Sequence, residues 1–263
     1  MINHRFLKTL GISVSERPLL CVALMLYWTW LNLAFQGPLF FSPLALASGF
    51  LLPTWCAPVF AAALAYFVVG MWFRRTNLVI RQRWYIGFVA TLMTLGALLC
   101  FLWIHSFEAS LDSAIPLLLY LAGSLAIGLG TALLMIEWGR VFGYLGPQQA
   151  LYHGIVAVFA SALLVALLSL LPLFAAQLCI VLIPVPLAVC LRKTIVALPQ
   201  KGLYTHGQNA ELKIPYKFLF TALLHGLSLG ILMGWLFLLG NQAGTSLLMA
   251  LSFTLASVLL LLT

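Results

Sequence analysis

The stretch RKTIVALPQKGLYTHGQNAELKIPYK, residues 192–217, separates two strongly apolar parts of the chain. It carries five basic side chains and a single acid, Glu211. The sequence supplies six apolar runs of membrane length before this stretch and two after it. Because a membrane-crossing helix needs about 20 apolar residues, the stretch predicts a basic linker between a six-helix first half and an incomplete second half.

Composition places the chain in the membrane class. Hydrophobic residues make up 64% of its 263 residues and charged residues 7%, and the mean hydropathy is +1.13. Soluble domains carry about 25% charged residues. Eighteen acidic and basic side chains cannot cover a soluble core of this length. We therefore expect an all-α polytopic membrane protein whose main partner is the lipid bilayer.

The apolar runs between polar or Pro/Gly breaks predict about eight transmembrane helices. The expected spans are 18–35, 54–73, 84–104, 114–136, 151–171, 173–191, 215–239 and 245–262. The expected units are a first bundle with its amino-terminal tail (1–191), the basic linker (192–215) and two helices of a second bundle (216–263).

Residues 151–191 form an uncharged stretch about twice as long as one span. It must fold back on itself, and Pro172 to Gln177 is the expected hairpin. The sixth span contains Pro184 and Pro186, which lack backbone donors. These two prolines predict a kink there.

Alternating the eight spans across the bilayer places all thirteen Lys and Arg residues on one side and leaves only Glu108 and Asp112 on the other. The positive-inside rule then predicts a multi-pass protein of the inner (plasma) membrane with a cytoplasmic amino terminus. The opening MINHRFLKTLGISVSERP is basic, but its apolar run starts only after Pro18 and has no small-residue cleavage site. We interpret it as a cytoplasmic tail rather than a signal peptide.

Several function classes are disfavoured by the sequence. It contains no Gly-rich phosphate loop, no HExxH, no GxSxG and no carboxylates paired at catalytic spacing, so we expect no enzyme activity and no cofactor. The five cysteines are scattered singly, which supports neither a disulfide framework nor a metal site. The formal charge of +8 is explained by the placement of the basic residues on one side of the membrane, so we expect no nucleic-acid binding by this segment.

Glu137 and Arg140 stand three residues apart at the end of the fourth span. On a continuing helix their side chains meet. One interpretation is a hydrated ion pair at the headgroup boundary, with Trp138 as an aromatic anchor. The other is a cytoplasmic gate latch, because a charged pair at a helix end can favour one of two bundle arrangements. The spacing does not separate these interpretations.

A ligand-lining set is predicted from uncommon polar and aromatic residues within spans, namely Asn32, Trp28, His153 and His225. These side chains either line a central cavity or bridge helices by hydrogen bonds. In the seventh span Gly226, Gly230 and Gly234 recur every four residues and predict close helix packing. The spans contain no deep carboxylate, which disfavours ordinary proton-coupled transport.

Two stretches carry a family resemblance. Glu137 to Pro147 contains a Trp-Gly-Arg turn followed by Leu-Gly-Pro, and Ile214-Pro-Tyr-Lys217 leads into the glycine-bearing span. They resemble the membrane portion of LuxR-type helix-turn-helix regulators of gut actinobacteria. The resemblance implies a major-facilitator-like bundle joined, in that family, to a carboxyl-terminal DNA-binding domain that this chain lacks. The chain would then be a truncated piece of such a regulator or a shortened relative.

Our leading hypothesis is the sensory, ligand-binding membrane region of a LuxR-type one-component transcriptional regulator, taking a small amphipathic molecule between its helices. The alternative is a major-facilitator-like secondary transporter or a fragment of one, since that superfamily shares the six-span halves around a midplane site. The loop from Arg74 to Arg83 departs from the Gly/Asp/Arg/Gly/Arg-type pattern of those transporters. A purely structural membrane subunit is the third hypothesis.

The first prediction concerns topology. In a variant without native cysteines, single cysteines at Arg81 and Lys201 should react with a membrane-impermeant thiol reagent only from the cytoplasmic side, and one at Asp112 only from outside. The reason is the segregation of all thirteen basic residues. Labelling at Lys201 from outside would contradict the span count.

Overall fold

The computed structural model describes residues 11–35, 56–107 and 113–198, and these ranges contain no strand. The helices are α2 (Pro18–Trp30) with the π-helical continuation η1 (Leu31–Phe35), α4 (Cys56–Met71), α5 (Phe73–Ile80), α6 (Tyr85–Phe107), α7 (Ala114–Leu145), α8 (Pro147–Ser169), α9 (Leu173–Leu182) and α10 (Pro184–Ala197). The predicted seventh and eighth spans lie outside the described residues, as do Lys201, Asp112, His225 and the glycines 226, 230 and 234.

Four helices are long and apolar enough to cross a membrane: α6, α7, α8 (from Gln148) and the segment Leu173–Ala197, which joins α9 and α10. Pro18–Ala34 and Ala57–Met71 are apolar but shorter. The all-α class and the membrane association are therefore confirmed for this part of the chain. Each of the first six predicted spans corresponds to an apolar helix, but the first two fall short of the length of a full crossing.

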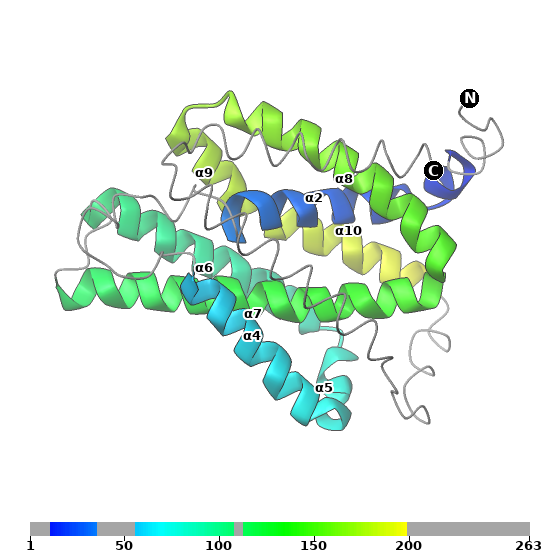
Figure 1. Cartoon of the computed structure of the whole chain (residues 1–263), viewed down its shortest axis with the longest axis horizontal. Helices are drawn as coiled ribbons and strands as arrows, with labels where there is room; N and C mark the ends of the chain where they lie inside the picture. Colours follow the sequence, from blue (N-terminus) through cyan, green and yellow to red (C-terminus); the bar gives the residue numbers. More distant parts are fainter. Residues whose placement is uncertain (1–10, 36–55, 108–112, 199–263) are drawn as a thin grey trace.

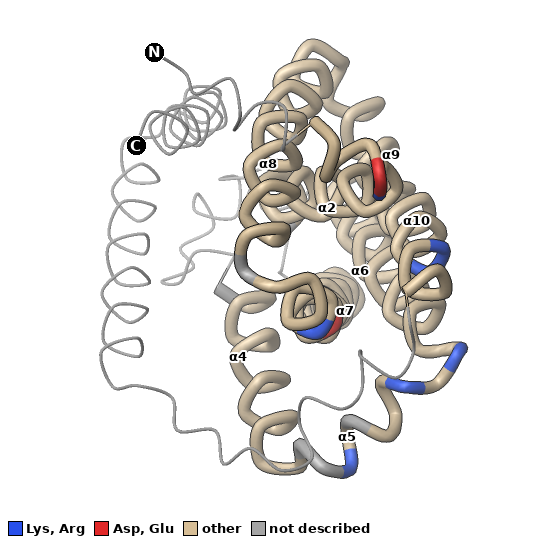
Figure 2. Tube along the Cα trace, turned by 90° about the vertical axis from the view of Figure 1, so that its right-hand side faces the viewer, with Lys and Arg blue, Asp and Glu red and all other residues tan. Residues whose placement is uncertain are grey.

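The helices form one bundle (Figure 1), and end-on α7 lies between α4 and α6 while α2 lies between α8 and α10 (Figure 2). Helix α10 also packs on α6, which joins the two groups. Buried side chains from these helices make up one continuous core, including Trp30, Trp103 and Trp138, each at most 1% exposed.

Prolines and one glycine mark the helix boundaries. Pro18, Pro147 and Pro184 stand at the first positions of α2, α8 and α10, where a missing backbone donor costs nothing. Gly146 joins α7 to α8 with φ +79°, a left-handed conformation that favours glycine. The interruption expected at Pro184 is confirmed, because α9 ends at Leu182 and α10 starts at Pro184.

Two local predictions need correction. The hairpin expected at Pro172 to Gln177 turns earlier, since α8 ends at Ser169 and α9 already begins at Leu173. Proline is well suited to precede that first turn and does not need to sit at the loop centre. The basic segment Arg74 to Arg83 is also no simple loop, because most of it forms α5, in which Ile80 is buried while Arg75 and Leu78 are exposed.

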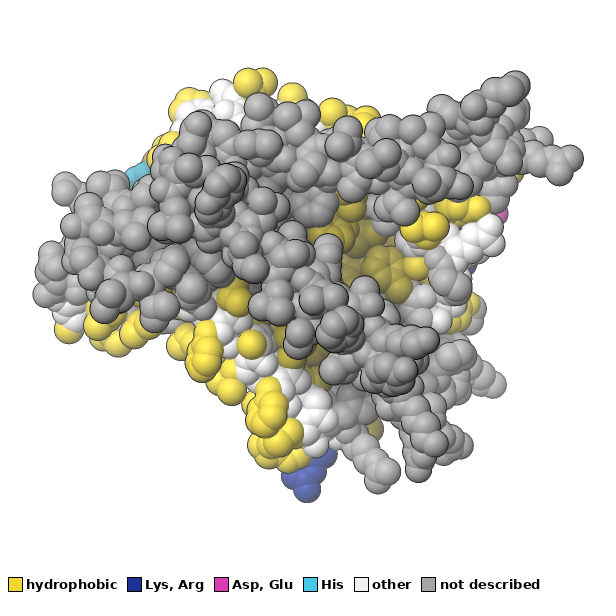
Figure 3. Space-filling view, in the orientation of Figure 1, with side chains coloured by type: hydrophobic (Ala, Val, Ile, Leu, Met, Phe, Trp, Pro, Cys, Tyr) yellow, Lys and Arg dark blue, Asp and Glu magenta, His cyan; other side chains and the backbone are white. Residues whose placement is uncertain are grey.

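Large apolar side chains cover much of the outer surface. Phe60 and Phe67 of α4 are 70% and 63% exposed, and Leu118 of α7 is 65% exposed. Figure 3 shows this apolar surface along α4, ending in basic side chains. A soluble protein rarely exposes continuous apolar area of this kind. The surface instead suits contact with lipid chains.

Glycines of α6 and α7 set the distance between these two helices. A Cβ atom at Gly96 would lie 2.8 Å from the backbone nitrogen of Ile127, and one at Gly123 would lie 2.7 Å from Cys100 Sγ and 3.0 Å from the carbonyl oxygen of Gly96. At Gly128 the added atom would collide with the carbonyl oxygen of Pro58 in α4. Helix α7 therefore approaches both neighbours closely, as small residues permit in membrane proteins.

The second prediction compares two glycines of α7. Gly123→Leu should destabilise the bundle by at least the roughly 1 to 3 kcal/mol typical of overpacking, because its side chain meets α6. Gly139→Leu is the matched control, since no heavy atom lies within 4 Å of a Cβ there. The check is thermal unfolding in detergent, and equal melting temperatures for the two variants would contradict the close α6–α7 contact.

Candidate functional site

The charged residues of the described part of the chain lie toward one end of the bundle, on the right in Figure 1, where α2 begins and α7 and α10 end; we call it the basic end. Their positions are the start of α2, the segment from α5 to the start of α6, the last turns of α7 and the last turns of α10. The residues are Glu16, Arg17, Arg75, Arg81, Arg83, Glu137, Arg140, Arg192 and Lys193. The described helices thus separate a charged end from an apolar body.

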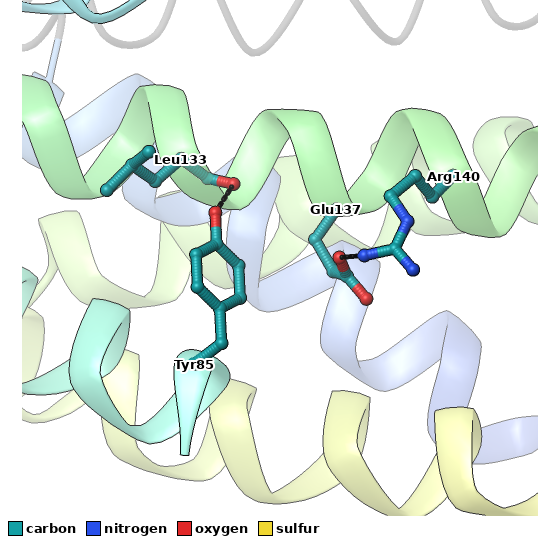
Figure 4. A network of polar contacts seen from close by, with 4 residues as sticks. All are labelled: Tyr85, Leu133, Glu137 and Arg140. Atoms are coloured by element: carbon teal, nitrogen blue, oxygen red, sulfur yellow. Dashed lines mark hydrogen bonds and ion pairs between the residues drawn. The ribbon is translucent and has the colours of Figure 1, made fainter. Parts of the chain in front are cut away.

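An ion pair lies inside the bundle at this end. Arg140 Nη1 donates to Glu137 Oε2 at 2.8 Å, and the side chains of Arg140 and Glu137 are 15% and 3% exposed (Figure 4). The pair forms because α7 continues as a helix past Ile136 to Leu145. The predicted contact is confirmed. Its burial shows that protein, rather than water, surrounds the carboxylate.

Trp138 is no exposed anchor. It is 1% exposed, and its ring lies 5.7 Å from that of Phe142 and 6.0 Å from that of Tyr27, measured between ring centroids. The interpretation as an aromatic anchor at the membrane surface is wrong, because α7 is covered at this position by α2. Aromatic packing at these distances stabilises the helices around the ion pair.

Tyr85, the first residue of α6, joins α6 to α7 next to the pair. Its hydroxyl donates to the carbonyl oxygen of Leu133 at 2.9 Å, one helical turn before Glu137 (Figure 4). The side chain of Tyr85 is buried, with 3% of the residue exposed. A rotation or displacement of α6 would therefore break this bond close to Glu137. The sequence contains no periodic or spacing signal for this contact.

His153 is a buried polar group in the second turn of α8, with 1% of the residue exposed. Its Nδ1–H donates to the carbonyl oxygen of Gln149 at 2.8 Å, and Nε2 is buried without a hydrogen-bond partner among the described residues. Gln149 in turn accepts a bond of 3.2 Å from Arg17 at the start of α2. This chain of contacts fixes α2 against α8 at the basic end.

His153 and Glu137 lie at similar depth in the bundle. Measured along each helix from Gly146, Glu137 is about 14 Å and His153 about 10 Å away. The basic end thus offers a buried ion pair and a buried imidazole acceptor, which suit recognition of a polar group on a small molecule. No cluster of three His, Cys, Asp or Glu side chains that could hold a metal occurs in the ranges described.

The other predicted ligand residues lie elsewhere. Asn32 in η1 donates from Nδ2 to the carbonyl oxygen of Trp28 at 2.9 Å, a contact within its own helix. The contact between Arg17 and Gln149 places these two residues at the same level of the bundle. Asn32 follows Arg17 by fifteen residues, whereas His153 follows Gln149 by only four. Asn32 is therefore roughly 16 Å deeper along the bundle than His153. Asn32 and His153 are therefore not brought together. A ligand role for Asn32 or Trp28 stays a prediction.

Two polar contacts between helices were not expected from the sequence. Trp30 Nε1 of α2 donates to Thr131 Oγ1 of α7 at 2.9 Å in the buried core. His105 Nε2 of α6 lies 2.7 Å from Gln177 Oε1 of α9, at the end opposite the basic end. A polar residue inside an apolar run was the available signal, since such a group needs a partner in lipid.

The third prediction tests the ion pair by a double-mutant cycle. Glu137→Gln and Arg140→Gln should each lower stability by more than the roughly 1 kcal/mol of a hydrated pair, toward the about 3 to 5 kcal/mol found when a buried pair is broken. The double variant should lose less than the two single losses together, as thermal unfolding in detergent would show. Arg83→Gln, an exposed change at the same end, is the control. Strict additivity would mean that the pair contributes no coupling.

Comparisons of the chain with protein-family models, with curated proteins and with solved structures found no match in any of the three.

Proposed function

We propose that the chain is the sensory membrane region of a LuxR-type one-component regulator, with a major-facilitator-like bundle of about eight helices that binds a small amphipathic molecule. The observation that carries the proposal is the Glu137–Arg140 pair, which is buried at the basic end of α7. The resemblance of Glu137 to Pro147 to that family supports the same assignment.

A buried ion pair suits a two-state switch. An unpaired charge inside protein is expensive, and removing one partner of a buried pair typically costs about 3 to 5 kcal/mol. A shift of an equilibrium from 1:99 to 99:1 needs about 5.5 kcal/mol. Both partners belong to α7, so a rearrangement of the bundle would change how far protein encloses the pair rather than separate it, and this change would supply part of the difference between two arrangements. Tyr85 and Trp138 connect it to α6 and α2, so both helices would move with it.

The ligand would contact the bundle near His153. Its buried Nε2 has no partner in the described part of the chain, and it lies at about the depth of Glu137. A molecule with one polar group and an apolar body would satisfy this acceptor and fill space among apolar helices. Binding energy would then act directly on the end of the bundle that carries the charges.

The positive-inside rule supports a cytoplasmic location for the basic end. The described Lys and Arg residues lie there, and so does the ion pair. A regulator needs its signal on that face, where a helix-turn-helix domain reads DNA. This arrangement favours sensing, with a multi-pass protein of the inner membrane and a cytoplasmic amino terminus.

A secondary transporter is the second candidate, and the burial of Glu137 favours it. The sequence predicts no deep carboxylate within a span and places Glu137 at the end of the fourth, but the Glu137 side chain is 3% exposed. An acid enclosed by protein is a common carrier of protons in transporters. The departure of residues Arg74 to Arg83 from the facilitator pattern supports the regulator over this candidate.

The fourth prediction separates the two. The purified chain in lipid nanodiscs is screened with small amphipathic compounds by thermal unfolding, and any stabilising compound is then tested for uptake into proteoliposomes. We expect at least one compound that raises the melting temperature. The apparent affinity for this compound, taken from the dependence of the melting temperature on its concentration, should fall at least about tenfold in His153→Ala and in Glu137→Gln and stay unchanged in Arg83→Gln.

For the regulator, uptake equals that of protein-free liposomes. Uptake above that background, abolished by Glu137→Gln, would instead establish the transporter. If stabilisation by every compound is unchanged in His153→Ala and Glu137→Gln, the proposed site is wrong.

A further inference from the structure

We propose that a groove between α6 and α10 is a binding site for one anionic glycerophospholipid, with its phosphate at Arg192. The groove has a volume of about 470 Å³. Its walls include Ile86, Ala90 and Leu98 of α6 and Val185, Val189 and Arg192 of α10. The proposal is independent of sensing or transport, since it rests on a different face of the bundle.

The groove exists because small residues face each other where α6 and α10 cross. Gly87 and Ala90 line the α6 side and Ala188 the α10 side. A Cβ at Gly87 would have no heavy atom within 4 Å, so space remains open at this position. Larger side chains at these three positions would close the gap between the helices.

The length of the groove matches one leaflet of a bilayer. Ile86 and Leu98 lie twelve residues apart on α6, which corresponds to about 18 Å. The hydrocarbon core of a membrane is about 30 Å thick, so one leaflet accounts for roughly 15 Å. An acyl chain lying along α6 and α10 would therefore run from the basic end to the middle of the membrane.

The polarity of the groove agrees with the polarity of a lipid. Helices α6 and α10 run antiparallel, so Arg192 stands at the same end as Ile86, at the basic end, while Val185 and Leu98 line the deep end. Arg192 is exposed, and no acidic side chain among the described residues forms an ion pair with it. A guanidinium binds a phosphate through parallel hydrogen bonds. Basic sites between transmembrane helices are typical binding places for anionic headgroups.

A helix of the chain itself fits this site less well. Residues 212–263, which contain the predicted seventh and eighth spans, carry no Asp or Glu and so offer no ion-pair partner for Arg192. A zwitterionic lipid carries its own ammonium beside the phosphate, so it gains less from an added cation than a lipid with net negative charge does. Charge therefore selects the anionic lipid.

The test uses native mass spectrometry of the full chain in detergent with added phosphatidylglycerol or phosphatidylcholine. One tightly held phosphatidylglycerol is expected, with an affinity about fivefold above that for phosphatidylcholine. Arg192→Gln should remove this preference. Lys193→Gln is the matched control, because it deletes the same charge from the neighbouring exposed position outside the groove, and it should keep the preference.

Gly87→Leu tests the groove itself, because the new side chain enters open space without a clash. The binding affinity for both lipids should fall at least about fivefold, while the melting temperature in lipid-free detergent should equal that of the wild type. Equal losses of preference in Arg192→Gln and Lys193→Gln would reduce the site to diffuse surface charge. Unchanged lipid binding in Gly87→Leu would overturn the proposal. A lower melting temperature of Gly87→Leu in lipid-free detergent would also overturn the proposal, because it would show that protein already fills the groove.

Discussion

The close approach of α7 to α6 and α4 is the contact on which the described bundle depends. In lipid, apolar side chains gain little by leaving their solvent, so helices associate through dispersion contacts and a few polar bonds. Gly96, Gly123 and Gly128 let backbones meet where any larger residue would collide. The resulting short separation brings Tyr85 within reach of the Leu133 carbonyl. The ion pair beside it is buried for the same reason.

Polar groups in this bundle are few, and most of those described have a specific partner. Thr131 receives the indole N–H of Trp30, and Gln177 meets His105 at the opposite end. Where no neighbouring helix supplies a partner, Thr29 and Thr194 bond to the carbonyl four residues earlier in their own helix. An unsatisfied group in lipid costs several kcal/mol. His153 Nε2 is one of a few buried polar atoms that the described residues leave without a hydrogen bond, together with Ser124 Oγ and Trp138 Nε1.

The two proposals use different surfaces of one architecture. The ion pair and His153 lie inside, where protein replaces water and charge interactions are strong. The groove at Arg192 lies outside, where the bilayer supplies both the apolar solvent and the anionic headgroups. Both sites lie at the basic end, where the described helices carry their Lys and Arg residues.

The amino-acid sequence by itself determined the all-α membrane class, the approximate positions of the first six apolar helices, the break before Pro184 and the meeting of Glu137 with Arg140. Each follows from local properties: the length of apolar runs, missing backbone donors and a spacing of three residues on a helix. Only the tertiary structure decided that Trp138 and Glu137 are buried, that Tyr85 bonds to α7 and that Asn32 lies away from His153. These facts depend on which helix packs against which face of another helix. In a soluble helix, alternation of polar and apolar residues marks the buried face, but a helix surrounded by lipid is apolar on all faces. The sequence therefore does not show which helices are neighbours.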